Sequence, residues 1–140
     1  MKFSKAVLIL IILFLSSVIL QIIFVFFAYF QGKLYSDELS DLILSTTKIY
    51  SIHVSILFTG TLFAQLEKER HNVNPNVWLI SIILSALWNL LLIISSFILL
   101  HVSPPDDFHK IIDFQEKVAG GSSFLITGVF SYLFLSKQKK

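Results

Sequence analysis

Charged residues divide this chain into four long uncharged segments. Between Lys5 and Lys33 lie 27 residues without Asp, Glu, Lys or Arg, and the gaps that end at Glu67, Asp106 and Lys137 hold 18, 35 and 19 such residues. The apolar stretches inside these gaps cover residues 6–30, 49–66, 77–100 and 118–136. About 20 helical residues cross the ~30 Å hydrocarbon core of a bilayer. The pattern therefore predicts an all-α fold, with four transmembrane helices in a single domain over residues 1–140.

Composition supports lipid as the solvent of this chain. Hydrophobic residues make up 55% of it and charged residues 14%, whereas soluble domains carry about 25% charged residues. A net charge of +2 is too small to indicate nucleic acid as a partner. With no cysteine, the chain has no disulfide and no thiolate site.

The first apolar segment is predicted to be a retained helix rather than a cleaved signal peptide. A signal peptide has an apolar region of about 7–15 residues and ends in small residues. Here the run covers residues 6–30 and ends in Phe27-Ala28-Tyr29-Phe30, which is too bulky for cleavage.

The distribution of basic residues predicts that both chain ends lie in the cytoplasm, because cytoplasmic flanks are enriched in Lys and Arg. In this orientation seven basic residues are cytoplasmic: Lys2, Lys5, Lys68, Arg70, Lys137, Lys139 and Lys140. Four are outside: Lys33, Lys48, Lys110 and Lys117. The outer loops are then residues 31–48 and 101–117, and the inner loop is 67–76.

Both outer loops contain a helical pattern of apolar residues. Leu39, Leu42 and Ile43 have helical spacing in the first loop, and a second segment from 106 to 117 follows Pro104-Pro105. We expect these segments to form short amphipathic caps at the membrane surface.

Small and polar residues recur four apart in every predicted span, which places them on one helix face. Two interpretations are open: helix packing, which small and hydroxyl-bearing residues favour in lipid, or the lining of a pore. The predicted packing or pore-lining residues are Ser17, Gln21, Ser55, Thr59, Gly60, Ser85, Asn89, Ser123, Thr127 and Gly128.

A shift of 68 residues suggests that the four helices are two hairpins related by tandem duplication. It aligns Gln21 with Asn89 and Ser17 with Ser85. Over residues 6–66 only seven of 61 positions are identical, so chance matching in a chain rich in Ile, Leu, Phe and Ser is the alternative.

Catalytic patterns are absent from the sequence, so we expect no enzyme and no cofactor. No Asp, Glu, Lys or Arg lies within the four apolar stretches, which disfavours proton-coupled transport. His53, His101 and His109 are expected on the outer side, near carboxylates. They are weak candidates for a zinc or proton-sensing cluster, and interfacial histidines that reach water are the alternative.

These observations predict a non-enzymatic membrane subunit that is a homo-oligomer, senses the envelope, and anchors or regulates a cytoplasmic partner. The partner face would be Lys68, Arg70, Lys137, Lys139 and Lys140. Phage-defence and immunity systems use membrane proteins of this build, which is analogy of shape alone. An oligomeric channel, pore or holin-like permeabiliser is the alternative function. Frequent Ile, Lys, Phe and Asn suggest a bacterial inner membrane as the location.

The predicted orientation is tested by cysteine labelling in intact cells. Because the chain has no native cysteine, cysteine placed at Glu38 or Asp107 is expected to react with an impermeant thiol reagent, and cysteine at Lys68 is not. The reverse labelling pattern would overturn the orientation.

Overall fold

A computed structural model describes residues 3–66, 73–102 and 109–135. Regular structure in these residues is helical throughout: α1 (Phe3–Phe30), α2 (Ser36–Leu66), α3 (Pro75–Phe97), the π-helical turn η1 (Ile98–Val102) and α4 (His109–Leu135). The all-α prediction is confirmed for this part of the chain.

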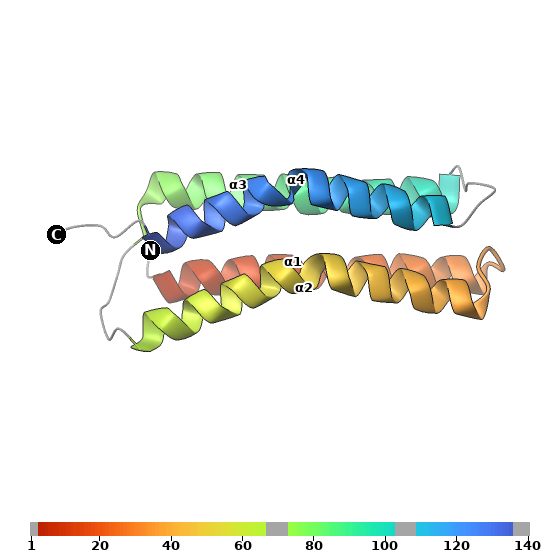
Figure 1. The fold of residues 1–140 in the computed structure, drawn as a ribbon, viewed down its shortest axis with the longest axis horizontal. Helices are drawn as coiled ribbons and strands as arrows, with labels where there is room; N and C mark the ends of the chain where they lie inside the picture. The colour runs from red at the N-terminus through yellow and green to blue at the C-terminus, as the bar shows by residue number, and fades with distance from the viewer. Residues whose placement is uncertain (1–2, 67–72, 103–108, 136–140) are drawn as a thin grey trace.

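The four α-helices form a bundle of two antiparallel hairpins (Figure 1). α1 packs against α2 and α3, and α4 packs against α2 and α3, so the helices occupy the corners of a square. The beginning of α1 and the end of α4 lie at the same end of the bundle (Figure 1), which we call the terminal end. The opposite end, where α1 turns into α2, we call the turn end.

Local sequence explains the helix boundaries that the structure describes. After α1, Gly32 adopts φ 70°, and its backbone N–H donates to the Tyr29 carbonyl at 2.9 Å. A left-handed glycine is a common way to end a helix. At the start of α3 the Asn74 side chain accepts a hydrogen bond from the Asn76 backbone N–H at 3.0 Å, and Pro75 occupies the first turn. Both features favour a helix start at this position.

Three helical segments are long and apolar enough to cross a membrane: Phe3–Phe30, Ser36–Leu62 and Pro75–His101. Within the described residues α4 is not among them, and its first turns carry Lys110, Asp113, Glu116 and Lys117. These are the features of a multi-pass membrane protein with a helical bundle.

Two expected loops are largely helical, which corrects the predicted boundaries. The loop expected over 31–48 is part of α2 from Ser36 onwards, and the loop expected over 101–117 is part of α4 from His109 onwards. The expected amphipathic caps are therefore the first turns of longer helices. Apolar length was the wrong criterion here, because a helix continues through polar residues when neither Pro nor Gly interrupts it. Residues 103–108 and most of the expected inner loop, 67–72, lie outside the described residues.

Phe14 lies at the centre of the core and has no exposed surface. Its ring centroid is 6.2 Å from that of Tyr50 on α2, 5.6 Å from that of Trp88 on α3 and 5.7 Å from that of Phe130 on α4. Aromatic pairs at such distances stabilise by about 0.5–1.5 kcal/mol beyond the burial of their area. Aromatic side chains from all four helices thus fill the middle of the bundle.

Candidate functional site

Polar side chains are buried inside the bundle on all four helices. They are Ser17, Gln21, Ser45, Thr46, His53, Ser81, Ser85, Asn89, Ser96 and Gln115. Polar groups inside a membrane protein need partners there, because hydrocarbon offers none, and such groups often mark functional positions. This set is therefore the candidate site.

A chain of hydrogen bonds joins the four helices through this set. Gln115 Nε2 on α4 donates to Ser96 Oγ on α3 at 2.6 Å. The Ser96 hydroxyl donates to the Leu92 carbonyl of its own helix at 2.7 Å and shares its proton with Gln21 Oε1 on α1 over a longer distance of 3.3 Å. Gln21 Nε2 donates to Tyr50 Oη on α2 at 2.6 Å. We call these four residues the polar chain. Gln21 is its central member, because its amide contacts both α2 and α3.

An ion pair lies beside the polar chain, where α2 and α4 meet. Lys48 Nζ is 3.8 Å from Glu116 Oε1, and Ser45 Oγ donates to the same oxygen at 3.4 Å. The side chains of Lys48 and Glu116 are 73% and 43% exposed. Exposed pairs of this kind contribute only about 0–1 kcal/mol to stability. The pair instead marks the place where buried polar groups reach the surface of the chain.

His53 lies between aromatic rings on the other three helices. Its ring centroid is 5.7 Å from that of Phe14, 4.7 Å from that of Trp88 and 6.4 Å from that of Phe130. Ser123 Oγ is 3.4 Å from its Nε2. His53 is only 1% exposed, so this imidazole is a buried titratable group at the level of Phe14.

Several buried polar atoms have no hydrogen-bond partner among the described residues. Around His53 they are His53 Nδ1, Ser85 Oγ, Trp88 Nε1 and Asn89 Oδ1; near the polar chain they are Thr46 Oγ1 and Gln115 Oε1. Buried polar atoms without a partner are uncommon in proteins. Their concentration here separates this region from the ordinary packed core.

The structure places four of the predicted packing residues in the bundle interior. Ser17, Gln21, Ser85 and Asn89 are buried. Gln21 joins helices as just described, whereas Asn89 Nδ2 donates to the Ser85 carbonyl of its own helix at 2.7 Å. The two amides that the 68-residue shift aligns therefore make different bonds and lie at different depths, because Gln21 contacts Ser96, which is about 10 Å farther along α3 than Asn89.

The remaining predicted packing residues lie at or near the outside of the single chain. Ser55, Thr59 and Gly128 are exposed. Half-buried positions in this set are Gly60, Ser123 and Thr127. A Cβ added at Gly120, Gly121 or Gly128 would meet no atom within 4 Å. The glycines of α4 thus do not serve close packing within the chain, because their face of the helix turns outward.

The expected histidine cluster on the outer side does not form. His53 is buried in the middle of the bundle, and the ring of His101 packs against Phe24, Phe27 and Phe97. The described residues hold no group of three His, Cys, Asp or Glu side chains that could bind a metal ion. The prediction failed because α2 begins at Ser36, which moves His53 from a helix end to the middle of a 31-residue helix.

Sequence reasoning missed Tyr50, Ser96 and Gln115, three members of the polar chain. Tyr50 was not among the predicted residues, and Gln115 fell in an expected loop. A signal for Gln115 is present, because it lies four residues before buried Ala119 and four after buried Ile111. Helical spacing that continues across the charged residues of 109–117 would have found it.

The predicted partner face (Lys68, Arg70, Lys137, Lys139, Lys140) lies outside the described residues.

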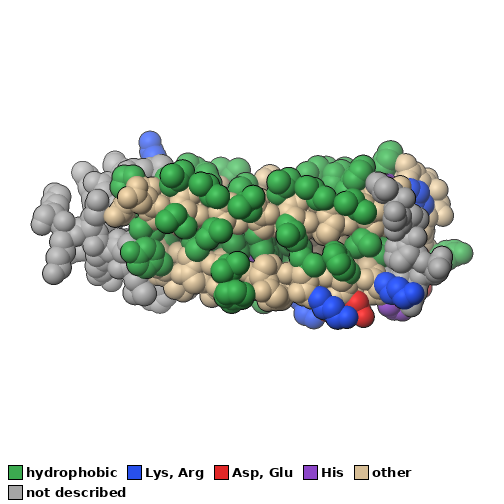
Figure 2. Space-filling model, turned by 90° about the horizontal axis from the view of Figure 1, so that it is seen from above, with side chains coloured by type: hydrophobic (Ala, Val, Ile, Leu, Met, Phe, Trp, Pro, Cys, Tyr) green, Lys and Arg blue, Asp and Glu red, His purple; other side chains and the backbone are tan. Residues whose placement is uncertain are grey.

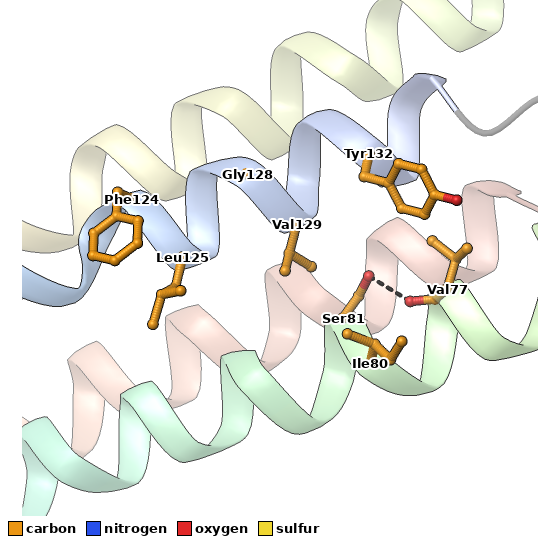
Figure 3. Close-up of a pocket in the computed structure, with 8 residues that line it drawn as sticks. All are labelled: Val77, Ile80, Ser81, Phe124, Leu125, Gly128, Val129 and Tyr132. Atoms are coloured by element: carbon orange, nitrogen blue, oxygen red, sulfur yellow. Dashed lines mark hydrogen bonds between the residues drawn. The ribbon is translucent and has the colours of Figure 1, made fainter.

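Two open grooves between α3 and α4 are apolar and distinct from this site. One, of about 350 Å³, lies toward the terminal end between Val77 and Ile80 on α3 and Phe124, Leu125 and Tyr132 on α4 (Figure 3). In this groove the Ser81 hydroxyl of α3 donates to the Val77 carbonyl, so it is already paired within its own helix. The other, of about 630 Å³, is lined mainly by leucine and isoleucine. Both present surfaces suited to lipid chains.

Comparison with known proteins finds no match to a family model, to a curated protein or to a solved structure. The site therefore has to be interpreted from its own geometry.

The link between Gln21 and Tyr50 is expected to contribute measurably to bundle stability, in contrast to Asn89. Interhelical hydrogen bonds in membrane proteins average about 0.6 kcal/mol, with a maximum near 1.7. A double-mutant cycle of Gln21→Leu and Tyr50→Phe, measured by unfolding in mixed micelles, should give a coupling energy in this range. Asn89→Leu combined with Tyr50→Phe should be additive, because Asn89 bonds within its own helix. Zero coupling for the first pair would contradict the assigned bond.

Proposed function

We propose that this protein is a non-enzymatic, four-span membrane subunit that self-associates and regulates or anchors a cytoplasmic partner. The single observation that carries this proposal is the way the bundle uses its polar side chains. Gln21, Ser96 and Gln115 bond helices to one another inside the chain, which is the behaviour of a closed structural unit.

The packed interior argues against a pore through a single chain. A conducting path needs polar groups along a continuous axis. Here Phe14, Trp88, Tyr50 and Phe130 fill the middle of the bundle, and Leu10 and Leu133 are buried toward the terminal end. Water or ions would have to displace these side chains to pass.

The outward faces of the helices differ in a way that supports self-association. Exposed residues of α3 between 79 and 98 are all Leu, Ile or Phe, and hydrophobic side chains cover much of the α3–α4 side (Figure 2). On α2 the exposed residues near mid-length include Ser51, Ser55 and Thr59 beside Ile52 and Phe58. On α4 they include Gly120, Gly121 and Ser131 beside Phe124 and Leu125. Small and hydroxyl-bearing residues in lipid favour contact with another helix.

Charges on the same α2–α4 face support protein contact as well. Lys48 is five residues from His53, which is about 7.5 Å along a helix. The Lys48 side chain is 73% exposed and lies at the end of the apolar stretch 49–66. Asp113, Glu116 and Lys117 are exposed on α4 near this level. Because the face carries both signs, two copies can pair opposite charges across a two-fold axis.

The proposed topology keeps the predicted orientation, with the terminal end in the cytoplasm. α4 is antiparallel to α3 and packs on both α3 and α2, so it would cross the membrane together with them. In this orientation the predicted partner face lies on the cytoplasmic side. Two hairpins packed through α1–α3 and α2–α4 also fit a tandem duplication about an axis along the membrane normal.

An oligomeric pore is the second candidate function, and the exposed hydroxyl stripe of α2 favours it. If several copies packed with Ser51, Ser55 and Thr59 facing a common axis, these hydroxyls would line it. The first proposal and this one predict different behaviour of the purified protein.

Self-association is tested by bulky substitutions on the α2–α4 face. Gly120→Leu or Ser55→Leu should weaken association in liposomes by roughly tenfold or more, which corresponds to about 1.4 kcal/mol. Gly120 lies one helical turn after Glu116, which pairs with Lys48 of α2. A bulky side chain keeps apart helices that small residues let approach. The matched control is Ser16→Leu, an exposed serine of α1, which should leave association unchanged. Subunit number can be measured by single-molecule photobleaching. Equal effects at all three positions, or none, would show that the α2–α4 face contacts lipid.

Partner recruitment is tested at the cytoplasmic basic residues. Replacing Lys68, Arg70 and the three lysines of 137–140 by Gln should abolish in-cell crosslinking of the protein to a soluble partner, while the oligomer persists. Lys33 and Lys110, replaced in the same way, are controls on the opposite side. Single-channel currents from the purified protein, lost in Ser55→Leu, would instead support the pore.

A further inference from the structure

We propose that His53 is a proton-binding site that exchanges with the aqueous phase at the turn end through the buried polar groups of the bundle. The inference deepens the proposed function, on which it rests for the statement that the turn end faces outward. The ligand of this site would be a proton, and binding of the proton would make helix packing depend on the external pH.

Position and surroundings single out His53 among the titratable groups of the described residues. It is 1% exposed and lies at the level where all four helices contribute an aromatic ring or an imidazole to the core. An ionisable side chain at membrane depth is costly to maintain and commonly belongs to a proton or ion path. Imidazole is also the side chain that ordinarily changes charge between about pH 5 and 8.

Groups facing His53 can accommodate a cation without a counter-charge. From α1 it meets Phe14, from α3 Trp88, and from α4 Phe130 and Ser123. Tyr50, one turn away on α2, is the other titratable group near it. None of these side chains carries a formal charge. Aromatic faces within about 6 Å attract a cation, and the ring centroids of Phe14 and Trp88 lie 5.7 and 4.7 Å from that of His53. This attraction works against the cost of removing the imidazolium from water.

The hydrogen-bonded part of the interior lies on one side of His53. Toward the turn end lie the polar chain and the buried hydroxyls of Ser45 and Thr46. Toward the terminal end the buried neighbours are mainly apolar, with the α3 hydroxyls of Ser81 and Ser85 as the polar members, and Ser81 bonds the Val77 carbonyl of its own helix. The bonds that join all four helices therefore lie on the turn side of His53.

The route toward the turn end begins at Glu116. Its carboxylate is partly exposed, contacts Ser45 and follows Gln115 in sequence. From Gln115 the polar chain leads through Ser96 and Gln21 to Tyr50, whose ring is 5.3 Å from that of Trp88. Unpartnered atoms lie at both ends of this chain, Gln115 Oε1 at one and Trp88 Nε1 and His53 Nδ1 at the other. Such atoms are the ones that buried water pairs with.

Protonation would act on helix packing through local contacts. One proton adds to the lone pair of the ring nitrogen that carries no hydrogen, and the hydronium ion that supplied it becomes water, so no other bond changes. The imidazolium then donates from both nitrogens, and its contacts with Ser123 and Trp88 must adjust. Because Phe14 and Trp88 belong to α1 and α3, the adjustment reaches all four helices.

The experiment uses the full-length protein in liposomes, with His71, His101 and His109 replaced by Gln so that His53 is the one histidine. Side-chain NMR signals of labelled histidine are followed between about pH 8 and about pH 4, a range that brackets ordinary imidazole titration. We expect a titration, and we expect it to follow the pH on the turn side when each side is changed separately. Orientation in the liposomes is scored by labelling a cysteine at Glu38.

Trp88 gives an independent optical signal of the same event. In a Trp78→Phe protein, Trp88 is the one tryptophan, and its emission should change with turn-side pH because the two rings are in contact. His53→Gln should abolish the change, with unfolding curves confirming that this variant is folded. Ser96→Ala, which interrupts the polar chain, should slow the response to a pH jump, and Ser16→Ala should not.

Three outcomes would overturn the inference: no titration of His53 in this range, a titration that follows the pH on the terminal side, or a Trp88 response that persists in His53→Gln. These outcomes leave the self-association test unaffected, since that test depends on Gly120 and Ser55. Failure of the proton site and failure of the proposed function are therefore distinguishable.

Discussion

A polar side chain surrounded by hydrocarbon has to find its partner within the protein, and the arrangement of this bundle depends on where those partners lie. Gln21 can satisfy its amide oxygen and nitrogen only if α2 and α3 both pack beside α1 in one rotation and one register. Ser96 then fixes the height of Gln115, and with it the register of α4. The hydrogen bonds are individually weak. Their contribution is to select one packing among many that apolar residues alone would allow.

Aromatic packing supplies what these bonds do not. Phe14 contacts rings from the other three helices and is fully buried, and loss of a buried Phe side chain typically costs about 3–5 kcal/mol. That cost exceeds the contribution of any one link in the polar chain by severalfold. Dense aromatic packing therefore holds the helices together, while the polar chain determines which helix faces meet.

Helix number and helix type were predictable from the sequence, because long uncharged runs have few alternatives to helices in a membrane. Ser17, Gln21, Ser85 and Asn89 are buried in the bundle, and the choice between packing and pore lining for their stripe stays a prediction. The same spacing in Ser55 and Thr59 gave no indication that this face turns outward, because periodicity shows that residues share a face but not what the face contacts. The start of α2 was predicted too late because it was set from the apolar stretch that begins at residue 49. The polar first turns of the helix, from Ser36, lie before that stretch. The role of Tyr50 requires a contact with Gln21, 29 residues away, which no local pattern contains.

Unequal apolar lengths of the helices have a mechanical consequence in a bilayer. The apolar stretches 6–30 and 77–100, on α1 and α3, correspond to about 36–37 Å of helix, whereas 49–66 and 118–136, on α2 and α4, correspond to about 27–28 Å. Lipid beside α1 and α3 is therefore met by a taller hydrophobic wall than lipid beside α2 and α4. The bilayer has to thin toward the α2–α4 side or the bundle has to tilt, and each ångström of mismatch costs a fraction of a kcal/mol. Two copies that met through their short sides, as in the proposed oligomer, would remove the thinned annulus between them, so bilayer thickness would itself favour that association.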